Sequence, residues 1–132
     1  MLRYMLDTDI CIHVMKRRPS PLRERFSKLD DQLCISSVTL AELWYGAHKS
    51  AQHSTNLQAV EQFAARLDVL AFTPAAAAHY GEIRAALERI GKPIGSNDML
   101  IAAHARSEGL IVVTNNEREF RRIDGLQIES WL

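Results

Sequence analysis

Four acidic side chains in this 132-residue sequence stand where predicted strands end or where the adjoining helices begin. Asp7 follows the apolar run Leu2–Leu6, and Glu42 lies on the helix after the second predicted strand. Asp98 begins the helix before the fourth strand, and Glu119 comes after that strand. Because open α/β sheets gather such groups at the carboxyl ends of their strands, we expect the four acids to converge.

Acids that converge within a few ångströms repel one another unless a cation lies among them. A set of oxygen ligands without histidine or cysteine favours a hard divalent cation, Mg²⁺ or Mn²⁺. Such a cation can activate water and stabilise the transition state of phosphoryl chemistry. The residue types therefore predict metal-assisted chemistry on a phosphate ester.

Each acid also has an interpretation that involves no catalysis. Asp7 could cap the helix that follows it, and Glu42 could pair with an arginine. Asp98 ends the loop Gly95–Asp98, which suits a helix cap, and Glu119 could be a solvated surface charge. Each signal is weak alone, and only the repeated position at strand ends makes the set informative.

Alternation of strand and helix patterns predicts an α/β fold with a mostly parallel sheet of about five strands flanked by helices. Apolar runs predict strands at residues 2–6, 33–36, 69–72, 110–113 and 126–129. Helical spacing predicts helices at residues 7–15, 21–29, 37–48, 54–67, 74–90, 97–105 and 117–122. We expect Thr8 or Asp9 to cap the first helix, and Ser37 or Thr39 to cap the third.

Length and composition fit one globular domain over residues 1–132, with 47% apolar residues. No apolar run approaches the roughly 20 residues that cross a bilayer, and no signal peptide pattern is present, so we expect a cytoplasmic protein with no membrane contact. The two cysteines, Cys11 and Cys34, suit small buried side chains better than a disulfide. Sixteen basic and sixteen acidic residues cancel, so net charge does not indicate a polyanionic partner.

The sequence resembles a known family over nearly its whole length. Four stretches, in order and with the usual spacing, look like the four motifs of PIN-domain ribonucleases and, more narrowly, of the VapC toxins of bacterial VapBC toxin–antitoxin pairs: 5–9, 35–46, 94–105 and 113–120. Four linked motifs make a specific signal, although any one of them would be weak.

The resemblance implies a PIN-like three-layer sandwich, a homodimer, and endonucleolytic cleavage of RNA that depends on Mg²⁺ or Mn²⁺. The three core acids of the family fall on Asp7, Glu42 and Asp98. Asp7 and Asp98 would be the direct metal ligands, and Glu42 would hold metal-bound water or ligate a second ion.

The fourth motif varies within the family. Asn116 stands where many PIN domains have an aspartate, and we expect Glu119 to contribute through water with Asn116 as its hydrogen-bonding neighbour. Thr114 is expected to orient Asp7 through its hydroxyl. Asp9 departs from the asparagine that relatives commonly carry. It could strengthen metal binding or cap the helix, and we favour the cap.

Basic residues near the motifs could hold RNA by its phosphates. Lys16, Arg17 and Arg18 end the first helix, and Arg118 lies in the fourth motif. A solvated helix end is the alternative for each. Two histidines, His13 and His104, could be proposed as general bases. We rank them lower because metal-activated water needs no histidine.

The function implied by the resemblance is that of a toxin that inhibits translation by cutting structured RNA. Relatives cut the anticodon stem-loop of initiator tRNA or a loop of large ribosomal RNA, and the motifs favour tRNA. A VapB-type antitoxin would block the acidic pocket, and only the complex would bind operator DNA. Trp44, Tyr45 and residues 54–67 carry apolar surface that either the core or such partners could cover.

Two other functions are compatible with parts of the sequence. Asp7–Asp9 has the Asp-x-Asp form of phosphatases with an aspartyl nucleophile, but a clearly placed lysine and a paired-aspartate third motif are missing. A PIN-like module that only binds RNA or partners would be expected to have lost its acids, whereas Asp7, Glu42 and Asp98 are all present.

Overall fold

Five parallel strands form the centre of the protein in its computed structural model, which describes residues 1–16 and 20–131. The sheet order is β3-β2-β1-β4-β5, and every neighbouring pair is parallel. The strands are β1 (Tyr4–Leu6), β2 (Leu33–Ser36), β3 (Asp68–Leu70), β4 (Ile111–Val113) and β5 (Gln127–Glu129). The predicted fold class is confirmed.

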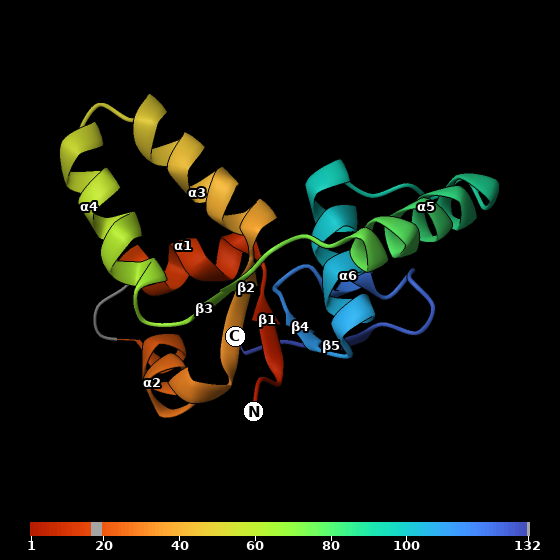
Figure 1. Ribbon diagram of the computed structural model, residues 1–132, viewed down its shortest axis with the longest axis horizontal. Helices are drawn as coiled ribbons and strands as arrows, with labels where there is room; N and C mark the ends of the chain where they lie inside the picture. Colours follow the sequence, from red (N-terminus) through yellow and green to blue (C-terminus); the bar gives the residue numbers. More distant parts are fainter. Residues whose placement is uncertain (17–19, 132) are drawn as a thin grey trace.

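Helices cover both faces of this sheet, as Figure 1 shows. One group comprises α1 (Thr8–Lys16), α2 (Pro21–Lys28), α3 (Ser37–Lys49) and α4 (His53–Ala64), with a 3₁₀ turn at Asp30–Gln32. The other comprises α5 (Pro74–Arg89), α6 (Ser96–Glu108) and the short α7 (Glu117–Phe120). The result is the three-layer arrangement that the sequence predicts.

Side chains of β1 point alternately to the two faces of the sheet, where two separate parts of the core lie. Tyr4 and Leu6 pack in the cluster under α1–α4, whereas Met5 packs in the cluster under α5 and α6. Successive side chains of a strand point to opposite faces, and both faces of this strand are buried, which explains its uninterrupted apolar sequence. Cys11 and Cys34 are buried and free, as predicted.

The direction of chain winding reverses between β1 and β4. Strands β2 and β3 are added on one side of β1, and β4 and β5 on the other. Ligands of open α/β sheets bind at such a switch point, outside the carboxyl ends of the strands. Asp7 follows β1 and Thr114 follows β4, so both lie at this point.

Several predicted element boundaries are wrong: the helix expected at 97–105 spans Ser96–Glu108, and the one expected at 117–122 ends at Phe120. The helix expected at 54–67 ends at Ala64, and the next turn closes through Arg66 N donating to Phe63 O at 3.1 Å. The strand expected at 69–72 ends at Leu70, because Phe72 N donates to Ser37 Oγ at 3.1 Å instead of extending the ladder. The end of this strand is set by a contact with a residue 35 positions away, which the local pattern does not contain.

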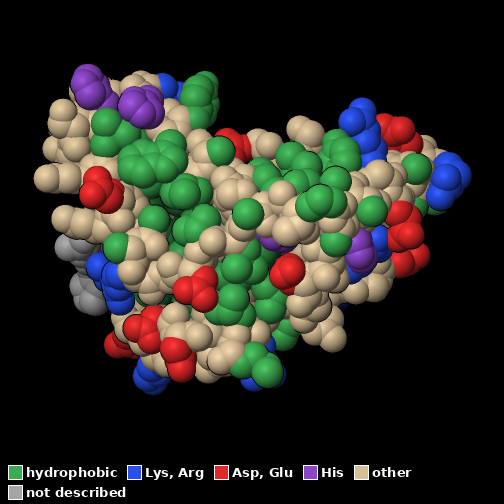
Figure 2. All heavy atoms as spheres, in the orientation of Figure 1, with side chains coloured by type: hydrophobic (Ala, Val, Ile, Leu, Met, Phe, Trp, Pro, Cys, Tyr) green, Lys and Arg blue, Asp and Glu red, His purple; other side chains and the backbone are tan. Residues whose placement is uncertain are grey.

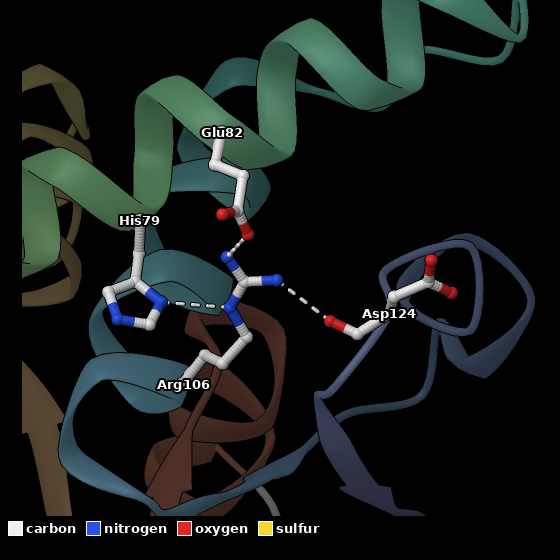
Figure 3. Close-up of polar contacts among 4 residues, drawn as sticks. All are labelled: His79, Glu82, Arg106 and Asp124. Atoms are coloured by element: carbon white, nitrogen blue, oxygen red, sulfur yellow. Dashed lines mark hydrogen bonds and ion pairs between the residues drawn. The ribbon is translucent and has the colours of Figure 1, made fainter.

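Arg106 joins three segments on the outer side of α6 (Figure 3). Its side chain donates to His79 Nδ1 on α5 at 2.9 Å, to Glu82 Oε1 on α5 at 2.5 Å, and to the carbonyl of Asp124 at 2.8 Å. These bonds tie α5 and the segment before β5 to α6. In the described part of the chain, no helix has the length and apolar character needed to cross a bilayer.

Candidate active site

Asp7 is held rigidly at the end of β1. Its side chain is 3% exposed, and its Oδ1 accepts a hydrogen bond from Ile10 N at 2.9 Å. Asp7 is therefore the residue that caps α1, and the expectation that Thr8 or Asp9 does so is wrong. A carboxylate has about four lone-pair sites, so the cap leaves acceptor capacity for another ligand.

Thr114 fixes Asp7 from the neighbouring strand. Its buried hydroxyl hydrogen-bonds the carboxylate of Asp7 and also accepts from Asn116 N at 2.8 Å. Burial raises the pKa of Asp7, while the bonds from Thr114 and Ile10 oppose that rise. The contact expected between Thr114 and Asp7 is present.

Glu42 and Asp98 approach from two different helices. Ser36 caps α3 by accepting from Val38 N at 3.1 Å, so the expected caps at Ser37 and Thr39 are wrong. Glu42 is half-buried on this helix. Helix α6 begins at Ser96 after Gly95, without a side-chain cap, so Asp98 is not the cap that its loop suggested.

The carboxylates act on one another across the switch point. The pKa of Asp98 is raised to about 6, first by burial and then by the charges of Asp7, Glu119, Asp9 and Glu42, in that order of effect. We call these five carboxylates, Asp7, Asp9, Glu42, Asp98 and Glu119, the acidic cluster. Within the described residues, none of them forms a salt bridge, including the one proposed for Glu42.

Glu119 is oriented from within its own turn. The side-chain amide of Asn116 donates to Glu119 Oε2 at 2.5 Å, as expected for neighbours in the fourth motif. Phe120 beside it is completely buried and anchors α7 to the core. Glu119 is therefore half-buried and directed, rather than a freely solvated charge.

Asp9 is the member of the acidic cluster that sequence reasoning misjudged. It is exposed in the first turn of α1 and does not cap the helix. Its charge raises the pKa of both Asp7 and Asp98. Its spacing of two residues from Asp7 was visible in the sequence, but only the tertiary arrangement places it near Asp98.

The chemistry of the acidic cluster suits a hard divalent cation. In the described ranges, no three His, Cys, Asp or Glu side chains are already arranged to hold a metal ion. The donors are nonetheless all oxygens, and their mutual repulsion is uncompensated, which is the condition that Mg²⁺ or Mn²⁺ relieves. The hydroxyl of Thr8, next to Asp7, is buried without a hydrogen-bond partner among these residues.

The predicted RNA-binding residues are only partly described. Lys16 is exposed at the end of α1, and Arg118 is exposed on α7 beside Glu119. Arg17 and Arg18 lie outside the described residues. His104 is completely buried and its Nδ1 lies 2.7 Å from Ser36 Oγ, so it is not available as a general base.

An apolar groove lies next to the acidic cluster. Its volume is about 350 Å³, and it runs between α1, α3 and α4, with Glu42 and Lys16 in its lining. Figure 2 shows the apolar side chains that gather over α3 and α4, and the dip in the outline between these helices and α5. The extra apolar surface predicted for this region is thus partly exposed, with Tyr45 at 62%.

Comparison with known proteins identifies the family. The PIN domain pattern matches residues 4–126. The tRNA(fMet)-specific endonuclease VapC of Shigella flexneri is 55% identical over 131 residues, which is 99% of each chain. This chain belongs to the VapC ribonucleases of the PIN-domain family. Ribonuclease VapC2 of Haemophilus influenzae is 52% identical over 132 residues, all of both chains.

Solved structures agree with the VapC assignment. DNA-bound VapBC from Salmonella typhimurium contains a chain with a TM-score of 0.96 and 53% identity, and all of both chains is covered. VapBC2 from Rickettsia felis, bound to a promoter DNA fragment, contains a chain with a TM-score of 0.94 and 39% identity. The match covers 99% of this chain and 100% of that one. The family resemblance is confirmed, and the phosphatase alternative is not supported.

Proposed function

We propose that this VapC ribonuclease cuts initiator tRNA in its anticodon loop, with Mg²⁺ or Mn²⁺ held by the acidic cluster. The observation that carries the metal dependence is the set of carboxylates that raise the pKa of Asp98 without a described cationic partner. The substrate is inferred from the relatives of Shigella flexneri and Salmonella typhimurium that are named tRNA(fMet)-specific endonucleases.

In this proposal Asp7 and Asp98 hold the ion, and Glu42 and Glu119 act through water molecules. The ion, when bound, supplies activation of water and neutralisation of charge on the phosphate. Thr114 keeps the Asp7 carboxylate in place, and Asn116 does the same for Glu119. These bonds are formed before any ligand arrives, so little reorganisation is needed when the site is filled.

RNA would be held by exposed basic side chains at the edges of the acidic cluster. Lys16 ends α1, the helix that follows Asp7, and Arg118 lies on α7, the helix that carries Glu119. Contacts of this kind neutralise phosphates and make binding depend on salt. Arg17 and Arg18 are assigned the same role from the sequence alone.

The partner of this toxin would be a VapB-type antitoxin. The relatives in the solved structures are parts of VapBC complexes, two of them bound to DNA. An antitoxin segment lying in the groove between α1, α3 and α4 would reach Glu42, which lines it. Binding of operator DNA would then belong to the complex. We also propose a homodimer and a cytoplasmic location.

Cleavage of purified tRNA tests this proposal. Wild-type protein is incubated with total tRNA and with ribosomes, in Mg²⁺ or in EDTA, beside Asp7→Asn, and the ends of the products are mapped. Asparagine still caps a helix, so this variant is expected to fold. We expect discrete cuts in one anticodon loop, no cuts in EDTA, and a loss of at least about 100-fold in the variant.

Two results would overturn the proposal. Equal products from wild type and Asp7→Asn, or undiminished cleavage in EDTA, would exclude the metal-dependent mechanism. Cuts confined to ribosomal RNA would leave that mechanism standing and would overturn the tRNA substrate.

A further inference from the structure

A buried hydrogen bond joins the helix of Asp98 to the turn that begins the helix of Glu42. His104 Nδ1 on α6 lies 2.7 Å from Ser36 Oγ, and both residues are completely buried. Ser36 ends β2 and caps α3. Across the described chain this is the one hydrogen bond between α6 and the segment made by β2 and α3.

The bond lies close to both acids along the chain. Ser36 and Glu42 are separated by less than two turns of α3, and Asp98 and His104 by less than two turns of α6. Helices transmit displacement along their axes with little bending over such a short length. A shift of α6 at His104 therefore moves Asp98 relative to Glu42.

Packing alone does not explain an imidazole at this position. Burial lowers the pKa of His104, and its Nε2 has no hydrogen-bond partner among the described residues. An apolar side chain of similar size would avoid both penalties. The ring is also held edge-on to Phe72, with centroids 5.4 Å apart at 79°, so its plane is fixed.

We propose that His104 is a positioning residue that, through Ser36, sets the distance between Asp98, which would hold the divalent cation, and Glu42, which would act on it through water. This inference rests on the proposed metal-dependent function. A displacement of about 1 Å at a catalytic group can reduce the rate about 100-fold, so a single bond of this kind can matter to activity more than to stability.

Three variants separate the bond from the bulk of the side chain. His104→Leu removes the polar atoms and keeps a similar size. His104→Asn places an amide where Nδ1 lies and so keeps a bond to Ser36. Ser36→Ala removes the same bond from the other side. Arg106→Leu, on the same helix but outside this bond, is the matched control.

Two quantities are measured on each protein. The first is the affinity of the metal-free protein for Mn²⁺, by calorimetry, which does not depend on catalysis. The second is RNA cleavage as a function of Mg²⁺ and of RNA, which gives kcat and KM separately. Thermal unfolding is recorded to confirm that each variant is folded.

We expect His104→Leu to bind Mn²⁺ about 10-fold more weakly and to lose about 10–100-fold in kcat, with KM for RNA changed by less than about 3-fold. His104→Asn should stay within about 3-fold of wild type on both measurements. Ser36→Ala removes the same bond together with the cap of α3, so it should lose at least as much as His104→Leu. The variant that carries both changes should be no worse than Ser36→Ala alone, because the bond between the two residues is already absent there. Arg106→Leu should keep the wild-type Mn²⁺ affinity.

Wild-type Mn²⁺ affinity and kcat in His104→Leu would overturn the proposal. If that variant does not fold, the same result in Ser36→Ala would overturn it. An equal loss in His104→Asn would also contradict it, because the bond to Ser36 would then not be the cause. If wild type neither binds Mn²⁺ nor cuts RNA, the proposed function itself fails.

Discussion

Helix α6 carries a charged side chain near each end, and the two have opposite electrostatic surroundings. Arg106, whose side chain is 14% exposed, donates to His79, Glu82 and the carbonyl of Asp124. Asp98, at the other end, faces four further carboxylates that raise its pKa. The same helix therefore carries one charged side chain, Arg106, that is hydrogen-bonded to several acceptors. It carries another, Asp98, whose described charged neighbours repel it.

This difference separates stability from function. Charges that serve the fold are expected to be paired, because an unpaired buried charge is unfavourable. The acidic cluster departs from that rule at the switch point of the sheet, where ligands bind. Its repulsion is thus best understood as a site prepared for a cation, whereas Arg106 serves the packing of α5, α6 and the segment before β5.

The largest expected effect is the loss of activity when Asp98, near the start of α6, is changed. Asp98→Asn should lower the rate of RNA cleavage at least about 100-fold, because it removes a proposed metal ligand. In EDTA the same variant should unfold at a higher urea concentration than wild type, since the repulsion is relieved. Initial rates and urea denaturation measure the two effects. A variant that is both inactive and less stable in EDTA would contradict this interpretation.

The opposite pattern is expected at Arg106. Arg106→Leu should lower the free energy of unfolding by about 1–3 kcal/mol, since a largely buried side chain loses its bonds to α5 and to the segment before β5, and should leave kcat within about 3-fold of wild type. The control is Arg84→Leu, whose exposed pair with Glu88 is expected to contribute nothing measurable. Urea denaturation and cleavage rates test both; a large fall in kcat for Arg106→Leu would show that the two ends are not independent.

Stability should change with pH because Asp98 binds its proton more tightly in the folded protein than in the unfolded chain. Its pKa is raised to about 6 in the folded protein, against about 3.9 in an unfolded chain. In this window the folded, metal-free protein binds more protons than the unfolded chain, so stability falls as the pH rises from about 4 to about 6. The stability advantage of Asp98→Asn should therefore be smallest near pH 4 and largest above pH 6.

His104 contributes a pH dependence of the opposite sign. Its pKa is lowered in the folded protein, so the unfolded chain takes up the proton first and stability falls as the pH drops below about 6.5. This contribution is common to wild type and Asp98→Asn and cancels in their difference. An advantage of Asp98→Asn that does not change with pH would contradict the raised pKa.

The smallest effect is expected at Asp9. Asp9→Asn should weaken Mg²⁺ binding by about 2–5-fold and leave kcat at saturating Mg²⁺ unchanged, because an exposed charge acts through solvent. The Mg²⁺ concentration at half-maximal cleavage measures this. Asp30→Asn, an exposed acid in the distant 3₁₀ turn, is the matched control and should change nothing. If the Mg²⁺ concentration at half-maximal cleavage is no higher for Asp9→Asn than for Asp30→Asn, Asp9 does not belong to the acidic cluster.

The sheet, the helices and the convergence of the core acids follow from the sequence because they depend on local patterns. The apolar run before Asp7 and the β-branched run before Thr114 identify strands that are paired on both sides. The order of motifs then places the acids at one edge. This is the part of the site that strand ends alone can predict.

The details that the sequence did not predict depend on contacts between distant residues. The bond between His104 and Ser36 joins residues that are 68 positions apart, and no local pattern signals it. The same holds for Arg106 and Glu82, which are 24 positions apart.

Thermal unfolding of wild type and Asp98→Asn, with and without Mg²⁺, tests the central claim that the repulsion in the acidic cluster prepares a cation site. Without metal, Asp98→Asn should unfold at the higher temperature. With Mg²⁺, wild type should gain stability by ligand binding and the order should reverse. If Mg²⁺ raises both unfolding temperatures equally, or neither, the acidic cluster does not bind the ion through Asp98.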